Sequence, residues 1–150
     1  MTIRFRSATR ADVPAVVALM ADDILGKGRE TADMAPYLAA FEAMEQEEGN
    51  SLIVGEDAAG TVVATYQLTF ISGLSLSATR RAQVEGVRVA AYLRGHGVGG
   101  EMFADAEARA RQAGCGLVQL TMNKSRTDSH RFYERLGFTA SHIGFKRYLD

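Results

Sequence analysis

A glycine-rich turn constrains the fold of this chain more than any other feature of its sequence. Residues 92–100 read YLRGHGVGG, with glycine at four of the last six positions. The turn follows a strand-like stretch that ends at Val89, and it precedes a helical pattern whose apolar face begins with Met102 and Phe103. Backbone N–H groups and the helix dipole favour a bound anion at such a junction, so the turn predicts a phosphate site.

Three other interpretations of the turn compete with this one. The glycines can simply make a tight turn. Gly95, Gly97 and Gly100 also match the dinucleotide pattern G-x-G-x-x-G, but the next strand ends in Met-Asn-Lys at 122–124 instead of an acidic residue, and only about 30 residues remain for a doubly wound sheet. The phosphate loop G-x-x-x-x-G-K-[ST] needs lysine where this chain has Glu101.

Periodicity assigns the remaining elements and indicates a chain that mixes helices with strands. Thr9, followed by Asp12 three residues later, is the N-cap signature of a first helix. We expect strands at 3–7, 51–56, 61–70, 81–89 and 117–122, helices at 9–20, 36–47, 98–113 and 128–136, and one or two closing strands within 138–148. This order indicates an α/β (α+β) protein with antiparallel strands in its middle and a β-turn-α-β unit after them.

The strand before the glycine turn changes phase partway along its length. Ala82 and Val84 share one face in a period of two, whereas Val87 and Val89 share the other. One extra residue must lie between the two pairs, and the Glu-Gly step at 85–86 is where the phase slips. A glycine at this place predicts a β-bulge, a feature that often redirects side chains next to active sites.

Length and composition limit the classes of protein to consider. The chain has 150 residues, 47% hydrophobic and 23% charged, which is the balance of one soluble globular domain spanning 1–150. A formal net charge of −1 gives no broad electrostatic reason to bind nucleic acid or a membrane. No apolar stretch is long enough to cross a bilayer, so we expect a cytoplasmic protein. Cys115 is the only cysteine and the histidines are scattered, so we expect no metal site.

Two stretches resemble the signatures of the GNAT acetyltransferases. Residues 84–89 (VEGVRV) followed by 94–99 (RGHGVG) are similar to that family's acetyl-CoA motif, an Arg/Gln-x-x-Gly-x-Gly/Ala turn after a bulged central strand. Residues 130–138 (HRFYERLGF) resemble the family's Phe-Tyr-Glu-x-Leu-Gly-Phe helix end. The resemblance implies a mixed, mostly antiparallel central sheet of about 6–7 strands with about four helices, in which splayed parallel strands form the acetyl-CoA cleft.

The resemblance also implies which residues bind acetyl-CoA, the co-substrate, and it implies no metal. The pantetheine arm would lie along the strand before the turn, and the turn amides would hold the pyrophosphate. Coenzyme-binding residues would then be Val87, Arg88, Val89, Arg94, Gly95, His96, Gly97, Val98, Gly99, Gly100, Asn123, Arg126, Ser129 and Phe132. The family commonly has Asn and Ala where this chain has Arg126 and Ser129, which puts the contacts of that loop in doubt. Asn123 is either a contact to pantetheine or substrate or a turn residue.

The implied reaction is direct attack of an uncharged primary amine, on a small molecule or peptide, at the thioester. Because an alkyl amine is mostly protonated at neutral pH, a base is useful, and Glu85 matches a family position that takes this role through water. Burial at the bulge would make Glu85 a better base, and its alternative role is that of a structural carboxylate. Tyr133 matches the tyrosine that protonates the leaving sulfur, with packing against Phe132 and Phe138 as the alternative.

Three further questions stay open in the sequence. A non-catalytic acyl-CoA-binding or regulatory domain is the alternative to an enzyme. The polar segment from Ala21 to Ala35 is a candidate substrate lid, whose acidic residues either attract a cationic amine or are simply solvated: Asp22, Asp23, Glu30 and Asp33. A late strand from Ile143 to Leu149 would be able to pair across a homodimer.

Overall fold

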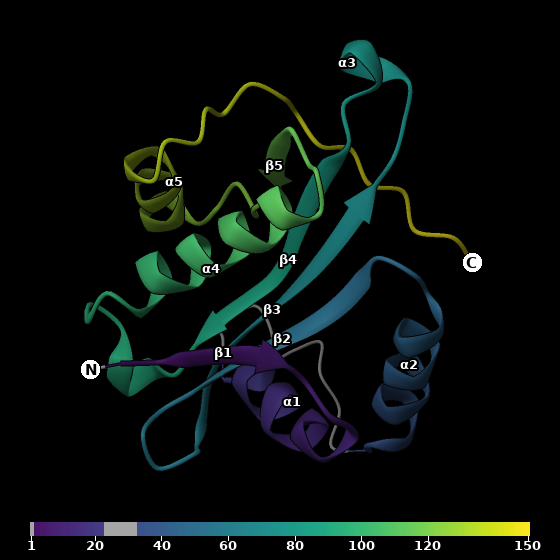
Figure 1. Cartoon of the computed structure of the whole chain (residues 1–150). Helices are drawn as coiled ribbons and strands as arrows, with labels where there is room; N and C mark the ends of the chain where they lie inside the picture. The colour runs from purple at the N-terminus through teal and green to yellow at the C-terminus, as the bar shows by residue number, and fades with distance from the viewer. Residues whose placement is uncertain (1, 23–32) are drawn as a thin grey trace. The chain divides into compact units, whose positions relative to one another are not determined.

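The computed structural model describes residues 2–22 and 33–150 (Figure 1). The chain divides into two units, Met1–Gln119 and Leu120–Asp150. The first unit contains almost the whole sheet and four of the α-helices, and the second contains one helix. Among the described residues, no helix combines the length and the apolar character needed to cross a membrane. The acidic lid falls partly outside the described residues, because Asp23 and Glu30 lie in the gap.

The first helical segment begins where its capping residues predict. After strand β1 (Arg4–Ser7), a 3-10 turn η1 (Arg10–Asp12) leads into helix α1 (Val13–Ala21). The Asp12 carboxylate accepts a hydrogen bond from the Thr9 backbone N–H at 2.7 Å, which satisfies a donor at the start of the helical segment. Helix α2 (Ala35–Gln46) packs beside α1, with Val13, Val17 and Phe41 in one buried cluster.

Four antiparallel strands form most of the sheet, whose strand order is β1-β2-β3-β4-β5. Strands β2 (Asn50–Glu56) and β3 (Val62–Ile71) make the predicted hairpin, closed by a hydrogen bond from the Asp57 N–H to the Thr61 carbonyl at 3.0 Å. Strand β4 (Arg81–Val89) pairs with β3, and β1 pairs with β2. The predicted antiparallel middle of the chain is therefore confirmed.

Strand β5 (Leu117–Leu120) lies parallel to β4 at the edge of the sheet. The Gly116 N–H donates to the Arg80 carbonyl at 2.8 Å, and the Gln119 side chain donates to Gln83 at 2.7 Å. The residue numbers increase together along the two strands in these pairs, which indicates that the strands are parallel. A crossover through helix α4 (Val98–Gln112) joins β4 to β5, as a parallel connection requires.

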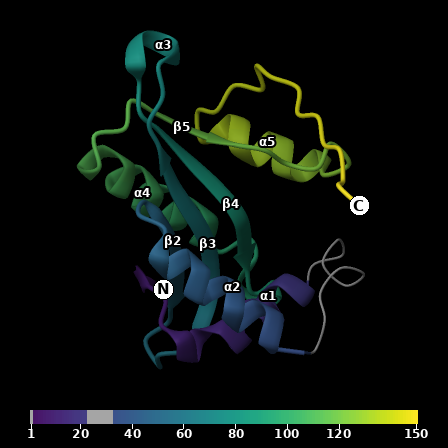
Figure 2. The same cartoon turned by 90° about the vertical axis from the view of Figure 1, so that its right-hand side faces the viewer.

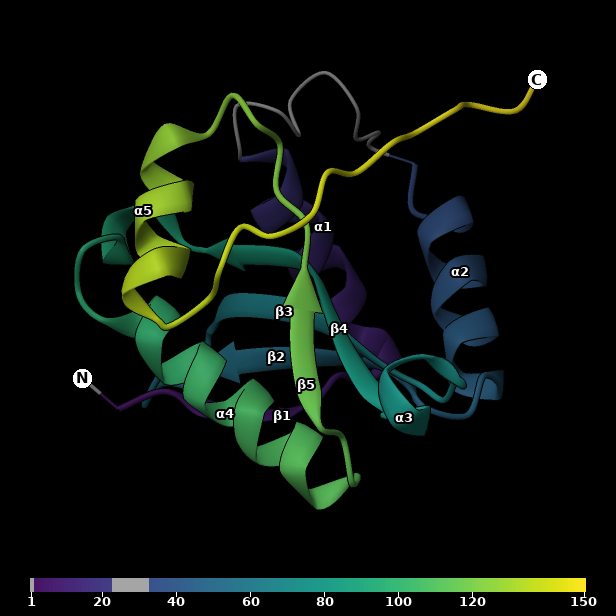
Figure 3. The same ribbon diagram turned by 90° about the horizontal axis from the view of Figure 1, so that it is seen from above.

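Helices cover both faces of this sheet. Helix α1 contacts β3 and β4, helix α2 contacts β2, and α4 contacts β3 and β4 from the opposite face (Figures 1 and 3). Because both faces of β3 are covered, the four consecutive residues 63–66 are at most 1% exposed, where a strand with one wet face would alternate. The centre of the core is therefore at β3, directly beside the strand that precedes the glycine turn.

The connection between β3 and β4 contains a left-handed turn. The short helix α3 (Ser75–Ala78) lies at the ends of these two strands (Figure 2). Its residues Leu76, Ser77 and Ala78 have φ angles of 55°, 58° and 62°. Residues other than glycine rarely adopt this conformation, because it costs each of them about 1–2 kcal/mol.

The second unit departs from the sequence prediction. Helix α5 (Thr127–Arg135) lies close to its predicted bounds, but residues 138–150 form no strand, so the predicted closing strands are wrong. The sheet consequently has five strands instead of about 6–7. Alternating apolar residues favour a strand only where another strand offers hydrogen bonds, and Ile143 and Phe145 instead stay 83% and 92% exposed.

Candidate functional site

The predicted bulge is present in β4. Thr65 pairs with Arg88 and Gln67 pairs with Glu85, so the single residue Tyr66 on β3 lies opposite two residues of β4. Those two residues are Gly86 and Val87. Gly86 has a φ of +61°, a conformation that glycine adopts without the steric cost of a side chain. The change of phase in the sequence therefore located the bulge to within one residue.

Beyond the bulge, β4 continues without β5 beside it. Strand β5 has four residues against the nine of β4, and its contacts with β4 lie at Arg80 and Gln83, near the start of β4. Residues 85–89 of β4 extend past that point, and they include the three residues predicted to contact pantetheine. Val87, Arg88 and Val89 are all half-buried, and the Val87 carbonyl accepts a hydrogen bond from the Arg88 guanidinium at 2.8 Å. This half of β4 can accept an extended ligand along its edge.

Short-range hydrogen bonds shape the turn that follows β4. A 3-10 turn η2 (Ala91–Leu93) begins after Ala90, whose N–H donates to the Val63 carbonyl of β3 at 2.8 Å. The Arg94 N–H donates to the Ala91 carbonyl at 3.3 Å, and the His96 N–H donates to the Leu93 carbonyl at 3.2 Å. Two of the amides predicted to hold phosphate therefore make bonds within the turn.

Glycines leave open space around the start of helix α4. Gly95 and Gly97 have φ angles of +83° and +81°, and a Cβ atom added at either residue, or at Gly100, would meet no atom within 4 Å. Val98 is 1% exposed and anchors the first turn of the helix in the core. The N–H groups of residues 98–100 have no acceptor within the helix, because the first N–H groups of any α-helix lack one.

Charged groups around this helix start have opposite signs. Arg94 is exposed and lies just before the glycines, where its guanidinium can meet an anion. Glu101 lies in the first turn of α4, where a carboxylate also interacts favourably with the helix dipole. The His96 ring nitrogen Nδ1 lies 3.2 Å from the Arg94 carbonyl oxygen, which holds the imidazole against the turn. The arrangement suits an anion that enters from the Arg94 side.

Glu85 lies at the bulge as predicted, but its surroundings differ from the prediction. The residue pairs with Gln67 on β3 and directly precedes Gly86. We expected burial to make it a better base, whereas the structure leaves its side chain exposed. The contacts of β4 with β5 lie earlier in the chain, at Arg80 and Gln83. A basic role for Glu85 therefore has to come from its position and a water molecule, without support from burial.

The loop before α5 lies in the second unit and is organised by Asn123. Its side-chain oxygen accepts hydrogen bonds from the Ser125 N–H at 3.0 Å and the Ser125 hydroxyl at 2.7 Å. The Arg126 N–H donates to the Asn123 carbonyl at 3.0 Å. These bonds support a turn role for Asn123, and its contact to pantetheine or substrate stays a prediction. Arg126 and Ser129 are half-buried near the start of α5.

Tyr133 lies on α5 within an aromatic cluster of the second unit. Its ring meets Phe132 edge to face at 5.3 Å and Phe138 at 6.0 Å between ring centres. The Phe138 N–H donates to the Tyr133 carbonyl at 3.0 Å, which folds the chain back after the helix ends. The packing role considered from the sequence is therefore real, and Tyr133 remains half-buried rather than enclosed. Glu85 and Tyr133 belong to different units of the chain.

The sequence did not predict one partly buried polar cluster in the first unit. Tyr66 on β3 donates to Asp105 on α4 at 2.6 Å, and Arg109 donates to the same oxygen of Asp105 at 2.8 Å. The spacing of Asp105 and Arg109 is typical of a helix ion pair, but only the fold brings Tyr66 to them. No group of three or more side chains able to hold a metal ion occurs within residues 2–22 and 33–150.

Comparison with known proteins gives a consistent group of relatives. A sequence model of the acetyltransferase (GNAT) family matches residues 17–138. An aminoalkylphosphonate N-acetyltransferase of Salmonella typhimurium is 46% identical over 57 residues, which are 38% of this chain and 37% of that enzyme's length. An uncharacterized N-acetyltransferase of Bacillus subtilis, YhdJ, is 29% identical over 132 residues, 83% of this chain and 86% of its own.

Solved structures also resemble the chain along its length. A transcriptional regulator from Bacillus halodurans C-125 is 38% identical, with a TM-score of 0.94 over 99% of this chain and 100% of its own. These similar proteins are thus described either as N-acetyltransferases or as a transcriptional regulator.

Proposed function

This chain belongs to the acetyltransferase (GNAT) family, and from that premise we propose that it transfers the acetyl group of acetyl-CoA to a primary amine of a small molecule or peptide. We propose that residues 1–150 act as one acetyltransferase domain. The observation that carries the proposal is the glycine-rich helix start directly after a bulged strand. In the proposed reaction the amine attacks the thioester directly, and acetyl-CoA supplies the activated acetyl group.

The start of α4 is the proposed site of the coenzyme pyrophosphate. Backbone N–H groups at Gly95, Gly97 and residues 98–100 are the proposed donors, since the amides of Arg94 and His96 bond within the turn. The open space where a Cβ would stand gives phosphate oxygens access to these donors. The exposed Arg94 guanidinium adds a charge-assisted contact.

The edge of β4 past the end of β5 is the proposed site of the pantetheine arm. An extended arm with amide groups can hydrogen-bond to a strand edge in the manner of an added strand. Residues 87–89 lie on that part of β4, and the bulge at Gly86 changes which backbone groups face its edge. We propose that Asn123, Arg126, Ser129 and Phe132 complete the coenzyme site.

Proton transfers are assigned to one residue of each unit. We propose that Glu85 accepts the proton of the attacking amine through a water molecule, because its exposed carboxylate adjoins the bulge. We propose that Tyr133 donates a proton to the leaving sulfur, since a phenol is a suitable acid for a thiolate. Contacts with Phe132 and Phe138 hold the half-buried ring in place, and this supports the assignment. A side chain that is already held loses less conformational entropy when it is oriented for proton transfer.

A panel of amines tests the proposal through release of free thiol from acetyl-CoA. Aminoalkylphosphonates belong in that panel because one relative is named for them, together with amino acids, polyamines and peptides with free amines. Turnover of any of these that depends on Tyr133 supports the enzyme. Failure to bind coenzyme A in calorimetry would remove the proposal entirely.

A regulatory domain that binds acyl-CoA without turnover is the second candidate. The similarity to a transcriptional regulator over 99% of the chain favours it. The two candidates differ in one measurement, because a binding domain retains affinity for coenzyme A but releases no thiol with any amine.

Location and assembly complete the proposal. We propose that the protein acts in the cytoplasm, where acetyl-CoA is available, and that it forms a homodimer through the segment after Phe138. Four apolar side chains of that segment are 83–92% exposed, more than a soluble surface usually leaves in one short stretch: Ile143, Phe145, Tyr148 and Leu149.

A further inference from the structure

Two side chains of helix α4, Asp105 and Arg109, tie the helix to two strands of the sheet. The Tyr66 hydroxyl donates to Asp105 Oδ2 at 2.6 Å, and Arg109 Nε donates to the same oxygen at 2.8 Å. Arg109 Nη2 also donates to the Phe5 carbonyl of β1 at 3.3 Å. The cluster therefore connects α4 to β3 through Tyr66 and to β1 through Arg109.

Tyr66 occupies a distinctive position in this cluster. It is the one residue of β3 that faces the two-residue bulge of β4, and its side chain is fully buried. Burial first, and then the hydrogen bond to Asp105, raise the pKa of Tyr66 well above its ordinary value. The hydroxyl therefore stays protonated, and able to donate to Asp105, throughout the ordinary pH range.

The tie lies at a useful distance from the proposed phosphate donors. Asp105 follows Val98, the first residue of α4, by seven positions, which is about 10 Å along a helix that rises 1.5 Å per residue. A hydrogen bond to the side of a rigid helix at that distance fixes two things. It fixes the position of the first helical turn along the helix axis, and it fixes the rotation of the helix about that axis. The backbone N–H groups of residues 98–100 are thus positioned relative to the bulged strand. The Tyr66 hydroxyl acts through Asp105.

We propose that Tyr66 is a positioning residue, which holds the donor end of α4 at the separation from the bulge of β4 that coenzyme A needs to contact both. This inference rests on the proposed function. Coenzyme A is in effect two linked ligands, a nucleotide diphosphate and a pantetheine arm, and linked ligands gain affinity only when both sites are correctly spaced. Loss of the tie should therefore weaken the linked ligand while leaving each half almost unaffected.

The substitution Tyr66→Phe tests the proposal because it removes only the hydroxyl. Calorimetry would compare coenzyme A with 3′-phospho-ADP, the nucleotide diphosphate half alone. We expect the Kd for coenzyme A to rise about tenfold, the effect of one lost hydrogen bond to a charged group, while the Kd for 3′-phospho-ADP stays within about twofold.

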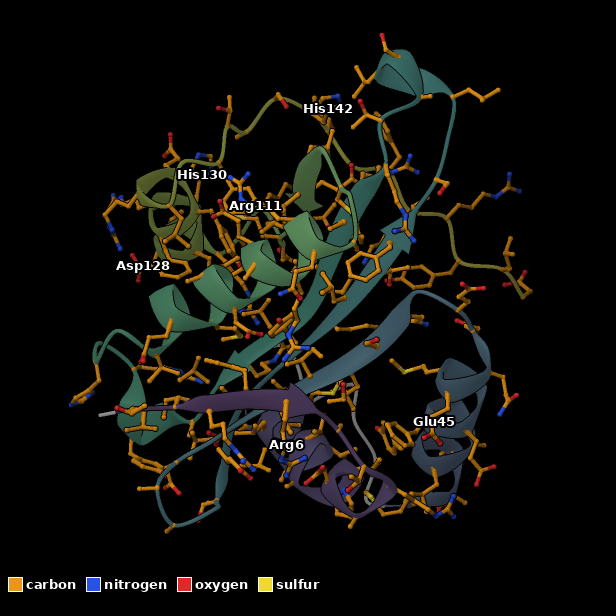
Figure 4. All side chains as sticks on the ribbon, in the orientation of Figure 1. Arg6, Glu45, Arg111, Asp128, His130 and His142 are labelled. Carbon is orange, nitrogen blue, oxygen red and sulfur yellow. The ribbon has the colours of Figure 1, made fainter. Side chains whose placement is uncertain are left out.

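The chain offers a matched control on the same helix. Glu107 and Arg111 form a second ion pair with the same spacing, but their side chains are 58% and 75% exposed. Arg111 is labelled in Figure 4. Glu107→Gln should leave both affinities unchanged. Asp105→Asn provides a second variant, since it keeps the shape of the side chain while removing its charge, and it should weaken coenzyme A selectively in the same way.

Two results would overturn the inference without affecting the proposed function. One is an unchanged affinity for coenzyme A in both folded variants, and the other is an equal loss for both ligands, which would mean general loosening of the phosphate site. If the unaltered protein binds neither ligand, the proposed function fails, and the inference fails with it.

Discussion

Gln119 on β5 donates a hydrogen bond to Gln83 on β4 at 2.7 Å, one residue before β5 ends. Strand β5 has four residues and contacts β4 near its start, whereas the bulge lies in the middle of β4. The first half of β4 therefore has a neighbouring strand on each side, and we propose that coenzyme A lies along the edge of the second half.

This arrangement predicts a local pattern of hydrogen exchange. Backbone amides of residues 81–84 lie between two strands and should exchange slowly with or without ligand. Amides within 85–89 should exchange faster in the free protein and become protected on addition of coenzyme A. Mass spectrometry of overlapping peptides from β4 measures both, and equal protection of 85–89 before and after addition would contradict a pantetheine site there.

Gly100 allows ligand binding to be altered without disturbing the fold. A Cβ atom at Gly100 would meet nothing within 4 Å, and its φ lies outside the left-handed range, so Gly100→Leu should fold and melt at least as high as the parent. The new side chain would occupy the proposed phosphate space, and we expect affinity for coenzyme A to fall at least about tenfold. Gly97→Leu is a poor test by comparison, because its φ of +81° adds backbone strain.

Tyr133→Phe should separate chemistry from binding. The phenyl ring keeps the edge-to-face contacts with Phe132 and Phe138, so stability and coenzyme affinity should change little. Loss of the proposed acid should lower kcat by about 10²–10⁴-fold with an acceptor identified in the amine panel. Steady-state kinetics gives kcat, and calorimetry gives the affinity. An unchanged kcat would leave Tyr133 with its packing role alone.

Asp12 should make the protein sensitive to acid. Two hydrogen bonds from Arg6, at 2.7 and 3.0 Å, lower the pKa of Asp12 from 3.8 to about 2, although partial burial opposes them. Because the folded pKa lies below the unfolded one, the stabilisation is present above about pH 4 and is lost as the pH falls toward 2. It amounts to about 2 kcal/mol near pH 7.

Urea unfolding of Asp12→Asn measures this contribution. The substitution should lower the free energy of unfolding by about 2 kcal/mol at pH 7 and by much less near pH 2. Glu45→Gln, an exposed change on α2, serves as the control and should behave like the parent at both pH values (Figure 4). If the free energies of unfolding of Asp12→Asn and the parent differ by the same amount at pH 7 and pH 2, the ion pair with Arg6 is not the source of that difference.

Phe145→Asp tests the proposed homodimer. The side chain is 92% exposed in the single chain, so the substitution should cost the monomer little stability. If the segment pairs with a second copy, a charge there should convert dimer to monomer in light scattering coupled to size exclusion. A parent protein that is monomeric at all concentrations would rule out this assembly.

Local patterns in the sequence were sufficient for most of the first unit. The bulge at Gly86 and the glycine turn before Val98 depend on backbone geometry that a few neighbouring residues determine. The positions of both were predicted correctly. The capping pair Thr9 and Asp12 is equally local.

Errors arose where the result depends on distant partners. The alternation around Ile143 and Phe145 indicates a strand, but it cannot supply the neighbouring strand that would hydrogen-bond to it. The exposure of the Glu85 side chain was not predicted, because burial in a strand depends on which elements lie beside it. The local sequence around Glu85 does not specify those elements. The hydrogen bond between Tyr66 and Asp105 was not predicted, because the two residues are 39 positions apart in the sequence.

The left-handed turn at residues 76–78 should favour substitution by glycine, whereas most positions in helices and strands disfavour it. In most helices and strands glycine is among the worst substitutions, because it adds freedom to the unfolded chain. At Ser77 the native φ of 58° penalises every residue that has a Cβ, and glycine escapes that penalty. A saturation library over this turn should therefore be enriched in glycine among its most heat-resistant clones, which is the opposite of the ranking expected along α4.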